Sequence, residues 1–411
     1  MSATAATADA ERMGITRADT SRTVIRARWM FDGGTAELIP DPIVIIENGT
    51  ITAAGSGPPG LAAADEIDLG TVTLLPGLVD GHTHLAFDAS AAPVDHLAAR
   101  DDAEAFAAMA AAARHAAAGG VTTLRDLGDR GYLSLGLRDA AGSDHTLPTI
   151  VAAGPPITTP GGHCHFLGAC ARGVDGVRAE IRAHAERGVD VIKIMASGGN
   201  LTRGSQPRRS QFGLEELRAA ADEAHRLGLP IVAHAHGTRA IRDALRAGFD
   251  GLEHVSFMTA DGVDPAPDDV LEALARTGCT VGMTLGLVPI PGAAPPPEIA
   301  ERLPGLTANA RALYQAGASI VLGTDGGIGP IKPHDAARWG VGDLVVRVGM
   351  SPLEALLAAT SNAATAIGLG DRKGRIAPGY DADILAVDGN PLTDPTVLHN
   401  LRAVFVRGHR Q

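Results

Sequence analysis

Short apolar runs alternate with alanine-rich, helix-like segments from about residue 74 onward, and this alternation restricts the fold more than any other feature. We interpret the runs as strands at Leu78–His84, Val121–Asp126, Thr149–Ala153, Val189–Ala196, Pro230–His236, Gly251–Val255, Cys279–Leu285 and Ser319–Asp325. Helical segments between them include Ala103–Ala118, Val177–Arg187, Leu214–Leu227, Thr238–Ala247 and Ala308–Ala316. Eight strands that each lead into a helix predict a (β/α)8 barrel of the TIM type.

An open, doubly wound sheet is the structural alternative. Such a sheet calls for a glycine-rich phosphate loop after its first strand, and this sequence has His82-Thr83-His84 at that place. The composition also suits buried parallel strands, because 45% of residues are hydrophobic but only 3% are aromatic. The core must therefore be built from small and branched aliphatic side chains.

The two ends of the chain read differently from its centre. Thr23–Phe31 and the hairpin Pro42–Ala53, which turns at Asn48-Gly49, are predicted strands. After a last helix at Pro352–Ala366, further strand-like pieces occur at Gly374–Ile376, Asp383–Val387 and Ala403–Arg407. We expect both ends to form one small β domain. The predicted division is a loose tail at 1–20, β-domain parts at 21–72 and 369–411, and the barrel at 73–368.

Charge and cysteine content limit the partners of the protein. The net charge of −12 argues against nucleic acid or an anionic membrane surface, since both favour basic patches. The three cysteines form no paired framework, which is typical of a reducing compartment. Neither a membrane-spanning apolar stretch nor the apolar centre of a secretory signal is present. The sequence therefore predicts a cytoplasmic protein with a small-molecule substrate.

Potential metal ligands occur at the ends of several predicted strands. His82 and His84 lie two residues apart, so in an extended chain their imidazoles leave the strand on the same side. Alone, such a pair equally suits a polar turn. However, later strands end in His234 and His236, in His254, and in Asp325. Since a barrel of this type places its working residues at the carboxyl ends of its strands, a metal site at this rim is predicted.

Lys193 lies within the apolar run Val191–Met195. Burial disfavours its charged form, so its pKa should fall. A neutral amine can take up carbon dioxide and become a carbamate, a carboxylate on a long arm that could bridge two metal ions. The alternative is a lysine paired with a carboxylate on the barrel rim.

Six stretches of the sequence read PGLVDGHTH, VIKIMASGG, IVAHAHG, LEHVSF, LGTDGG and GRIAPGYDADILAVD. Together they resemble the metal-dependent amidohydrolase superfamily, in particular its imidazolonepropionase-like and Xaa-Pro dipeptidase-like (prolidase) branch. The resemblance implies that His82, His84 and Asp325 hold one metal ion and that His234 and His254 hold the other. It also implies that carboxylated Lys193 and a hydroxide bridge the two ions. The barrel and the composite β domain are implied as well, and relatives of this kind often form homo-oligomers.

A two-metal site of this composition suits hydrolysis. Two divalent ions lower the pKa of a water molecule and polarise a substrate carbonyl. Asp325 is then the natural group to take the proton and hand it to the leaving amine. Imidazole and carboxylate ligands without thiolate favour zinc, although manganese, cobalt and iron also bind such sets.

Substrate contacts are less specific in the sequence. His163 follows the third strand, in the stretch Gly161–His165. The resemblance implies that His163 contacts the substrate or its developing oxyanion. The alternatives are that it orders the loop, or that His163 and His165 together bind a metal ion. Strand alternation alone leaves His236 open as a metal ligand, whereas the resemblance implies that only His234 binds metal and that His236 lines the substrate pocket. In the loop Ser197–Gln211, Arg203 is our choice to bind a substrate carboxylate, against the alternative of a solvated arginine.

These features favour a two-metal amidohydrolase that cleaves a dipeptide or an N-acyl or arylcarbonyl amino acid. Opening of a cyclic amide, or hydrolysis of a lactone or ester, uses the same chemistry. A deaminase is disfavoured by Lys193, because single-metal deaminases of this superfamily usually lack that lysine. A non-catalytic assembly protein is disfavoured because every ligand position is filled.

Overall fold

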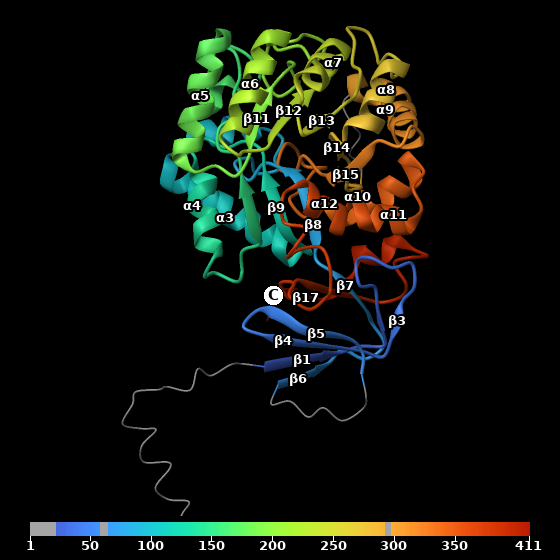
Figure 1. Ribbon diagram of the computed structural model, residues 1–411. Helices are drawn as coiled ribbons and strands as arrows, with labels where there is room; N and C mark the ends of the chain where they lie inside the picture. The colour runs from blue at the N-terminus through green and yellow to red at the C-terminus, as the bar shows by residue number, and fades with distance from the viewer. Residues whose placement is uncertain (1–21, 58–64, 292–296) are drawn as a thin grey trace, which may run out of the picture.

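The computed structural model describes residues 22–57, 65–291 and 297–411, and parallel strands form its centre (Figure 1). The strands are β8 Leu78–Thr83, β9 Val121–Asp126, β10 Thr149–Ala152, β11 Ile192–Met195, β12 Ile231–Ala235, β13 Gly251–His254, β14 Thr280–Thr284 and β15 Ser319–Gly323. They are ordered β10-β9-β8 and β11-β12-β13-β14-β15. Every neighbouring pair within these two groups is parallel.

Backbone hydrogen bonds join the two groups of strands into a closed barrel. Between β15 and β8, the amides of Thr324 and Asp325 donate to the carbonyl of His82 at 3.0 and 2.7 Å. Between β10 and β11, Asp190 donates to Ala152 at 2.9 Å, and Ile157, which follows β10, donates to Lys193 at 2.8 Å. The predicted barrel is therefore confirmed.

Helices surround the barrel (Figure 1). They are α2 Pro93–Ala99, α3 Asp102–Ala118, α4 Leu133–Ala141, α5 Gly173–Arg187, α6 Leu214–Arg226, α7 Thr238–Ala247, α8 Asp268–Thr277, α9 Pro297–Gln315, α10 Ala337–Asp343, α11 Pro352–Ala358 and α12 Ser361–Ala366. Local sequence sets their ends. Asp101 and Glu104 form a capping box at the start of α3, and glycines in the left-handed conformation follow α5, α7 and α8.

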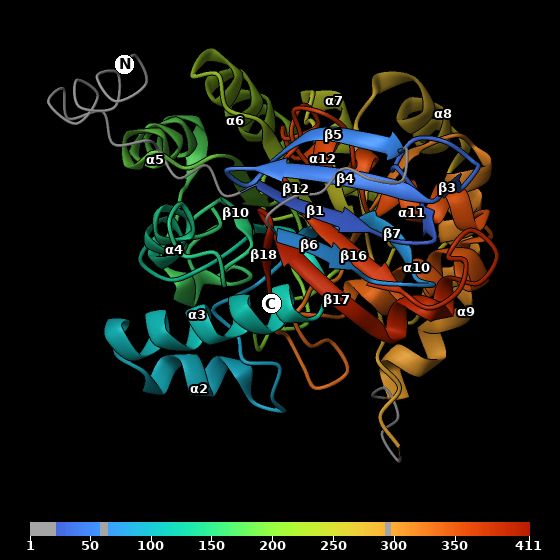
Figure 2. The same cartoon turned by 90° about the horizontal axis from the view of Figure 1, so that it is seen from below.

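A small β domain lies below the barrel and contains both ends of the described chain (Figure 2). One sheet has the order β5-β4-β1-β6 and the other β18-β17-β16-β7-β2-β3. Its strands are β1 Arg22–Arg26, β2 Trp29–Met30, β3 Ile39–Pro40, β4 Pro42–Glu47, β5 Thr50–Ser56, β6 Asp65–Asp68, β7 Thr73–Pro76, β16 Ile384–Val387, β17 Leu401–Val406 and β18 His409–Arg410. The expected β domain composed of both chain ends is thus confirmed.

Some predicted elements differ from the structure. Gly374–Ile376 is not a strand, because Gly374 takes a positive φ of 81° in a tight approach to Thr360. The predicted helix Pro352–Ala366 is broken into α11 and α12 by the non-helical backbone of Thr360. The predicted helix Ala308–Ala316 is only the second half of α9. The predicted tail at 1–20 and most of the proline-rich stretch after β14 lie outside the described residues.

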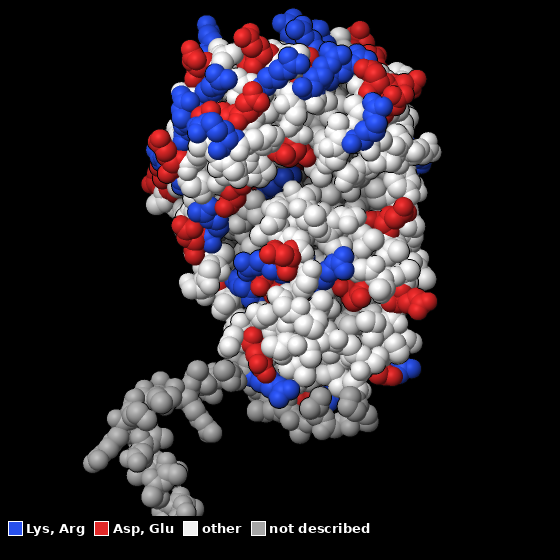
Figure 3. Space-filling view, viewed as in Figure 1, with Lys and Arg blue, Asp and Glu red and all other residues white. Residues whose placement is uncertain are grey.

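Charged side chains of both signs are interspersed over the upper part of the face in Figure 3, above α5 to α8. The lower part of that face shows fewer charges. No helix among the described residues is long and apolar enough to cross a membrane.

Candidate metal centre and substrate cavity

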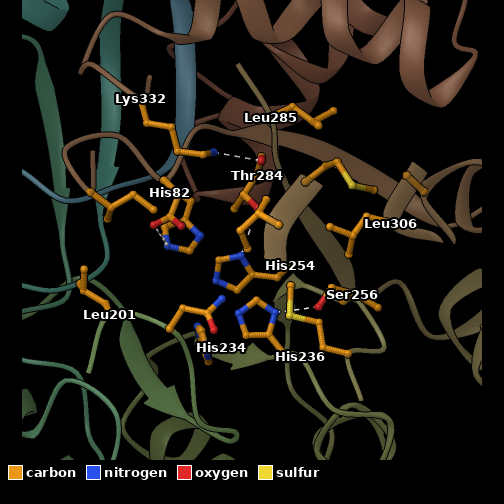
Figure 4. Close-up of a pocket in the computed structure, with 18 of the residues that line it drawn as sticks. His82, Leu201, His234, His236, His254, Ser256, Thr284, Leu285, Leu306 and Lys332 are labelled. Atoms are coloured by element: carbon orange, nitrogen blue, oxygen red, sulfur yellow. Dashed lines mark hydrogen bonds and ion pairs between the residues drawn. The ribbon is translucent and has the colours of Figure 1, made fainter. Parts of the chain in front are cut away.

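Histidine and carboxylate side chains from different strands meet in a cavity at the carboxyl ends of the barrel strands (Figure 4). His82 belongs to β8 and His84 follows it; His234 belongs to β12, His254 ends β13, and Asp325 follows β15. Lys193 in β11 lines the same cavity, whose volume is about 280 Å³. The structure therefore brings together all six residues predicted as metal ligands.

The first cluster contains His82, His84 and Asp325. The Nε2 atoms of the two histidines are 3.3 Å apart. Asp325 Oδ1 lies 3.6 Å from Nε2 of His82 and 3.3 Å from Nε2 of His84. Ligand atoms bound to one zinc ion with tetrahedral geometry lie roughly 3.4 Å apart, given metal–nitrogen bonds near 2.1 Å. The spacing of this cluster fits a single divalent ion.

The second cluster contains His234, His236 and His254, whose candidate ligand atoms all lie within 4.8 Å of one another. The ring centroids of His234 and His254 are 4.6 Å apart, and those of His254 and His82 are 5.1 Å apart. The two clusters are therefore adjacent. Together they are two histidine-rich candidate sites consistent with a binuclear divalent metal centre.

Lys193 is fully buried, and its Nζ has no hydrogen-bond partner among the described residues. No ion pair joins it to a described carboxylate, so the alternative of a rim salt bridge is wrong. Burial lowers the pKa of Lys193 to about 8. Because an unpaired buried amine is costly, this orphaned atom fits a site that is completed by a further group.

Hydrogen bonds from behind orient three of the histidines. His82 Nδ1 lies 2.9 Å from Oε2 of Glu253, His234 Nε2 lies 3.0 Å from the carbonyl oxygen of Gly198, and His84 Nδ1 lies 3.3 Å from the carbonyl oxygen of Gly128. These partners are acceptors only, so each nitrogen facing them carries the proton. The other ring nitrogen of each histidine is left with a lone pair, as a metal ligand requires.

Two other histidines face hydroxyl groups. His254 Nδ1 is 3.0 Å from Oγ1 of Thr284, and His236 Nδ1 is 2.7 Å from Oγ of Ser256. Because a hydroxyl both donates and accepts, these contacts do not select one tautomer. His236 also stacks on His254 with ring centroids 4.5 Å apart. Both roles weighed for His236, metal ligand and pocket lining, agree with this position.

The environment keeps the imidazoles neutral and Asp325 ionised. Burial lowers the pKa of His82 to about 4, and it holds the pKa values of His234 and His254 well below 6.5. For Asp325, burial raises the pKa, but the hydrogen bond with His84 and the nearby ring nitrogens of His82 and His84 outweigh burial and hold the pKa well below 3.8. Neutral imidazoles and a carboxylate are the protonation states that bind metal ions.

Backbone strain accompanies the same residues. His254 and Asp325 adopt positive φ angles of 73° and 58°, although residues other than glycine rarely take this conformation. Each lies where its strand ends, so the strained turn directs the side chain into the cavity rather than along the barrel.

His163 lies in the loop after β10, and its ring centroid is 4.9 Å from that of His234. Its backbone amide donates to Oε1 of Gln211, which follows β11, whereas its Nδ1 is buried without a hydrogen-bond partner among the described residues. Burial lowers its pKa to about 3, so the ring is neutral at pH 7. Gly199 makes room for the ring, since a Cβ there would lie 2.3 Å from His163 Nε2.

Arg203 is exposed and does not line the cavity, and Arg208 and Arg209 are exposed as well. The prediction that Arg203 binds the substrate therefore finds no support in the geometry, because its loop turns outward after Leu201. Besides Lys193, the lysine and arginine side chains that do line the cavity are Lys332 and Arg347. Lys332 donates from Nζ to the carbonyl of Thr284 at 3.1 Å (Figure 4) and to the carbonyl of Thr324 at 2.6 Å.

Sequence reasoning missed a buried ion pair beneath the centre. Glu253 Oε1 accepts a hydrogen bond from Arg125 at 2.9 Å, while its Oε2 faces His82. Burial raises the pKa of Glu253, but the hydrogen bond from neighbouring His82 and the charge of Arg125 outweigh burial and lower the pKa to about 2. The only signal in the sequence was a charged residue within each of two apolar runs, Arg125 in β9 and Glu253 in β13.

A closed (β/α)8 barrel with clustered imidazole and carboxylate groups at its carboxyl-end mouth defines the class of this protein as a barrel with a candidate metal centre. Residues 73–410 match the amidohydrolase family, and the chain belongs to this family.

Known proteins resemble this chain to different extents. Ochratoxinase of Aspergillus niger is 35% identical over 243 residues, which cover 57% of this chain and 48% of that protein. The chain thus spans about half the length of this curated relative. Imidazolonepropionase of Deinococcus deserti is 27% identical over 87% of this chain and 88% of its own. The crystal structure of a Xaa-Pro dipeptidase with bound methionine in its active site superposes with a TM-score of 0.81, at 27% identity, covering 95% of this chain and 100% of that one.

Proposed function

We propose that this protein hydrolyses an amide bond in a small substrate, either a dipeptide or an N-acyl or arylcarbonyl amino acid. The observation that carries the proposal is the convergence of His82, His84, His234, His254 and Asp325 around the buried, unpartnered amine of Lys193. A structural cluster of histidines gives no reason for an unpaired lysine at its centre.

In this proposal one ion would be held by His82, His84 and Asp325 and the other by His234 and His254, and Lys193 would supply a further ligand. Zinc suits these ligands best, since none is a thiolate. When bound, a pair of divalent ions lowers the pKa of water and polarises a substrate carbonyl.

The surroundings of Lys193 support its assignment as a carbamate. Its depressed pKa raises the neutral fraction at pH 7, and the neutral amine adds to carbon dioxide to form a carbamate with release of one proton. The product is an anionic oxygen ligand in place of a buried amine that lacks a hydrogen bond.

Asp325 and His163 take the remaining roles. The low pKa of Asp325 keeps it ionised at neutral pH, so it accepts a proton from the attacking water and returns it to the nitrogen of the leaving amine. Neutral His163 donates a hydrogen bond from its ring to the carbonyl oxygen as negative charge develops there.

Two relatives support the proposed reaction class, one by its structure and one by its sequence. One similar structure is that of a Xaa-Pro dipeptidase, and one similar sequence is that of ochratoxinase. Opening of a cyclic amide is the second candidate, because the match to an imidazolonepropionase covers most of both chains.

The test combines metal analysis with a substrate screen. The purified chain is expected to retain about two divalent ions and, after zinc or manganese loading, to hydrolyse dipeptides or N-acyl amino acids; carbon-13 bicarbonate labelling should show a carbamate on Lys193. A chain that binds no divalent metal would exclude the proposal. Turnover of cyclic amides alone would select the second candidate.

Asp325→Asn tests the proton-transfer role. The variant should fold, and its turnover should fall by roughly 10²- to 10⁴-fold, because an amide cannot carry the proton. Asp222→Asn, an exposed aspartate in α6, is the matched control and should keep the wild-type rate. Wild-type rates in the Asp325 variant would remove its assigned role.

A further inference from the structure

The cavity divides into a polar and an apolar half. The candidate metal ligands form the polar half, and side chains from α9 and from the loops after β14 and β15 form the other. In Figure 4, Leu285 and Leu306 lie on the opposite side of His254 from Leu201. The apolar wall stays in contact with water unless a ligand covers it. An apolar part of the substrate would remove this surface from water, which is energetically favourable.

Helix α9 supplies the main part of this wall. Its cavity-lining residues recur every three or four positions and form one stripe along the helix: Ile299, Leu303, Leu306, Ala310 and Leu313. Ile299, Leu303 and Leu306 are only partly buried. The stripe of this helix therefore keeps apolar surface that the protein itself does not cover, at the mouth of the site.

The wall lies on the Asp325 side of the centre. Leu285 and Leu287 follow β14, Ile328 follows β15, and α9 connects these two strands. Asp325 also follows β15. Because the group that returns the proton must reach the leaving nitrogen, the leaving amine and its substituents belong on this side of the cavity.

Cations line the same side. Lys332 uses two of its three N–H groups on the carbonyls of Thr284 and Thr324, so one remains for a ligand. Arg347 donates from Nε to Asp343 at 2.7 Å, and its terminal nitrogens make no hydrogen bond to the described part of the chain. Asp343 in turn accepts the backbone amides of Gly286 and Leu287 at 3.1 Å each, which holds Arg347 against the wall.

We propose that this half of the cavity is the subsite for the leaving amine, and that it selects an α-amino acid with a large apolar side chain. The side chain packs on the α9 stripe, and the carboxylate meets Lys332 and Arg347. The inference rests on the proposed amide hydrolysis and names its substrate class: N-acyl derivatives of amino acids such as phenylalanine or leucine.

A matched substrate series tests both parts of the subsite on the zinc-loaded protein. The series is N-acetyl-L-phenylalanine, N-acetylglycine, which lacks the side chain, and N-acetyl-2-phenylethylamine, which lacks the carboxylate. The kcat/KM for N-acetyl-L-phenylalanine should exceed that of each partner by roughly 10- to 100-fold, as the burial of one aromatic side chain or one charge-assisted contact provides. Equal values across the series would overturn the subsite.

A variant of the wall gives the second test. Leu306→Trp fills the apolar half, so the ratio of kcat/KM for N-acetyl-L-phenylalanine over N-acetylglycine should fall by about tenfold. Ala308→Trp places the same side chain on the exposed face of α9 and should leave the ratio unchanged. An unchanged ratio in Leu306→Trp would also overturn the subsite.

Binding without turnover separates this inference from the proposed function. Calorimetry should show that free L-phenylalanine binds at least tenfold more tightly than glycine or 2-phenylethylamine, and that Leu306→Trp removes this preference. A protein that hydrolyses no amide but shows this binding pattern would refute the hydrolase proposal and keep the subsite. Hydrolysis without this binding preference would keep the hydrolase proposal and refute the subsite.

Discussion

At the scale of single residues, the centre depends on which ring nitrogen of each histidine carries its proton. Glu253, Gly128 and Gly198 supply acceptor-only partners to His82, His84 and His234. Because the protonated nitrogen faces the acceptor, the lone pair of the other nitrogen is free before any ion arrives. The protein therefore orders its candidate ligands in advance, and the residues behind the histidines are as important as the histidines themselves.

Glu253→Gln tests this ordering. The amide replaces an acceptor with a group that also donates, so His82 is no longer held in one tautomer and Arg125 loses its ionic partner. The affinity for zinc, measured by competition with a chelator, should fall by roughly 10- to 100-fold. Glu272→Gln, an exposed glutamate in α8, is the control. Equal zinc affinities in the two variants would show that Glu253 has no orienting role.

At the scale of elements, β14 shows how a strand makes room for the chemistry of its neighbour. Gly282 pairs with Glu253 of β13, and a Cβ at this glycine would lie 1.9 Å from Glu253 Oε2. The absence of a side chain on one strand therefore creates the space in which the carboxylate of the next strand reaches His82.

Gly282→Ala should displace the Glu253 carboxylate and destabilise the protein by about 1–3 kcal/mol, the usual cost of overpacking a filled interior. Gly342→Ala in α10 is the control, since a Cβ there meets nothing within 4 Å. The control should be neutral or stabilising by up to about 1 kcal/mol, because alanine favours a helix. Denaturant unfolding measures both, and equal stabilities would contradict the tight fit at Gly282.

The elements also show how far the sequence alone could lead. Barrel strands were predictable because each is a short, mainly buried and mostly apolar run, and the ligand positions were predictable because histidine or aspartate stands at the end of several of these runs. The start of α9 was not predictable from the sequence, because Pro304 interrupts its helical pattern of apolar residues and its apolar stripe faces a cavity instead of the sheet. Arg203 was chosen, and Lys332 was not considered, because sequence order does not reveal which way a loop turns after it leaves a strand.

At the scale of the whole molecule, the β domain anchors the strand that carries the first two ligands. β7 pairs with β16 and β2 inside the β domain, and the chain then enters β8 after the amide of Gly77 donates to Asp383 at 2.9 Å. Strands from both ends of the described chain therefore hold the segment that leads into β8. β7 leads directly into β8, which contains His82 and is followed by His84, so one short segment of chain joins the β domain to the candidate metal centre.

Lys373 forms buried ion pairs next to the point where the β domain meets β8. Removing its charge tests how much these ion pairs stabilise the protein. Its Nζ lies 2.8 Å from Asp381 and 2.7 Å from Asp383, and the side chain is fully buried. Lys373→Met leaves these carboxylates without their buried cation, which should reduce the free energy of unfolding by about 3–5 kcal/mol at pH 7. Arg372→Met is the matched control, because Arg372 contacts the same Asp381 but is 49% exposed, and it should lose less than about 1 kcal/mol.

The pH dependence of this loss has a definite sign. Burial raises the pKa of Asp381, but Lys373 and Arg372 outweigh burial and hold that pKa below its ordinary value of 3.8. The stabilisation from Asp381 is therefore complete above the pKa of the unfolded chain and disappears as the pH falls through the lower folded pKa. The difference in stability between wild type and Lys373→Met should shrink below about pH 4. A difference that stays constant from pH 7 to pH 3 would mean that lost packing, and not the lost charge, destabilises the variant.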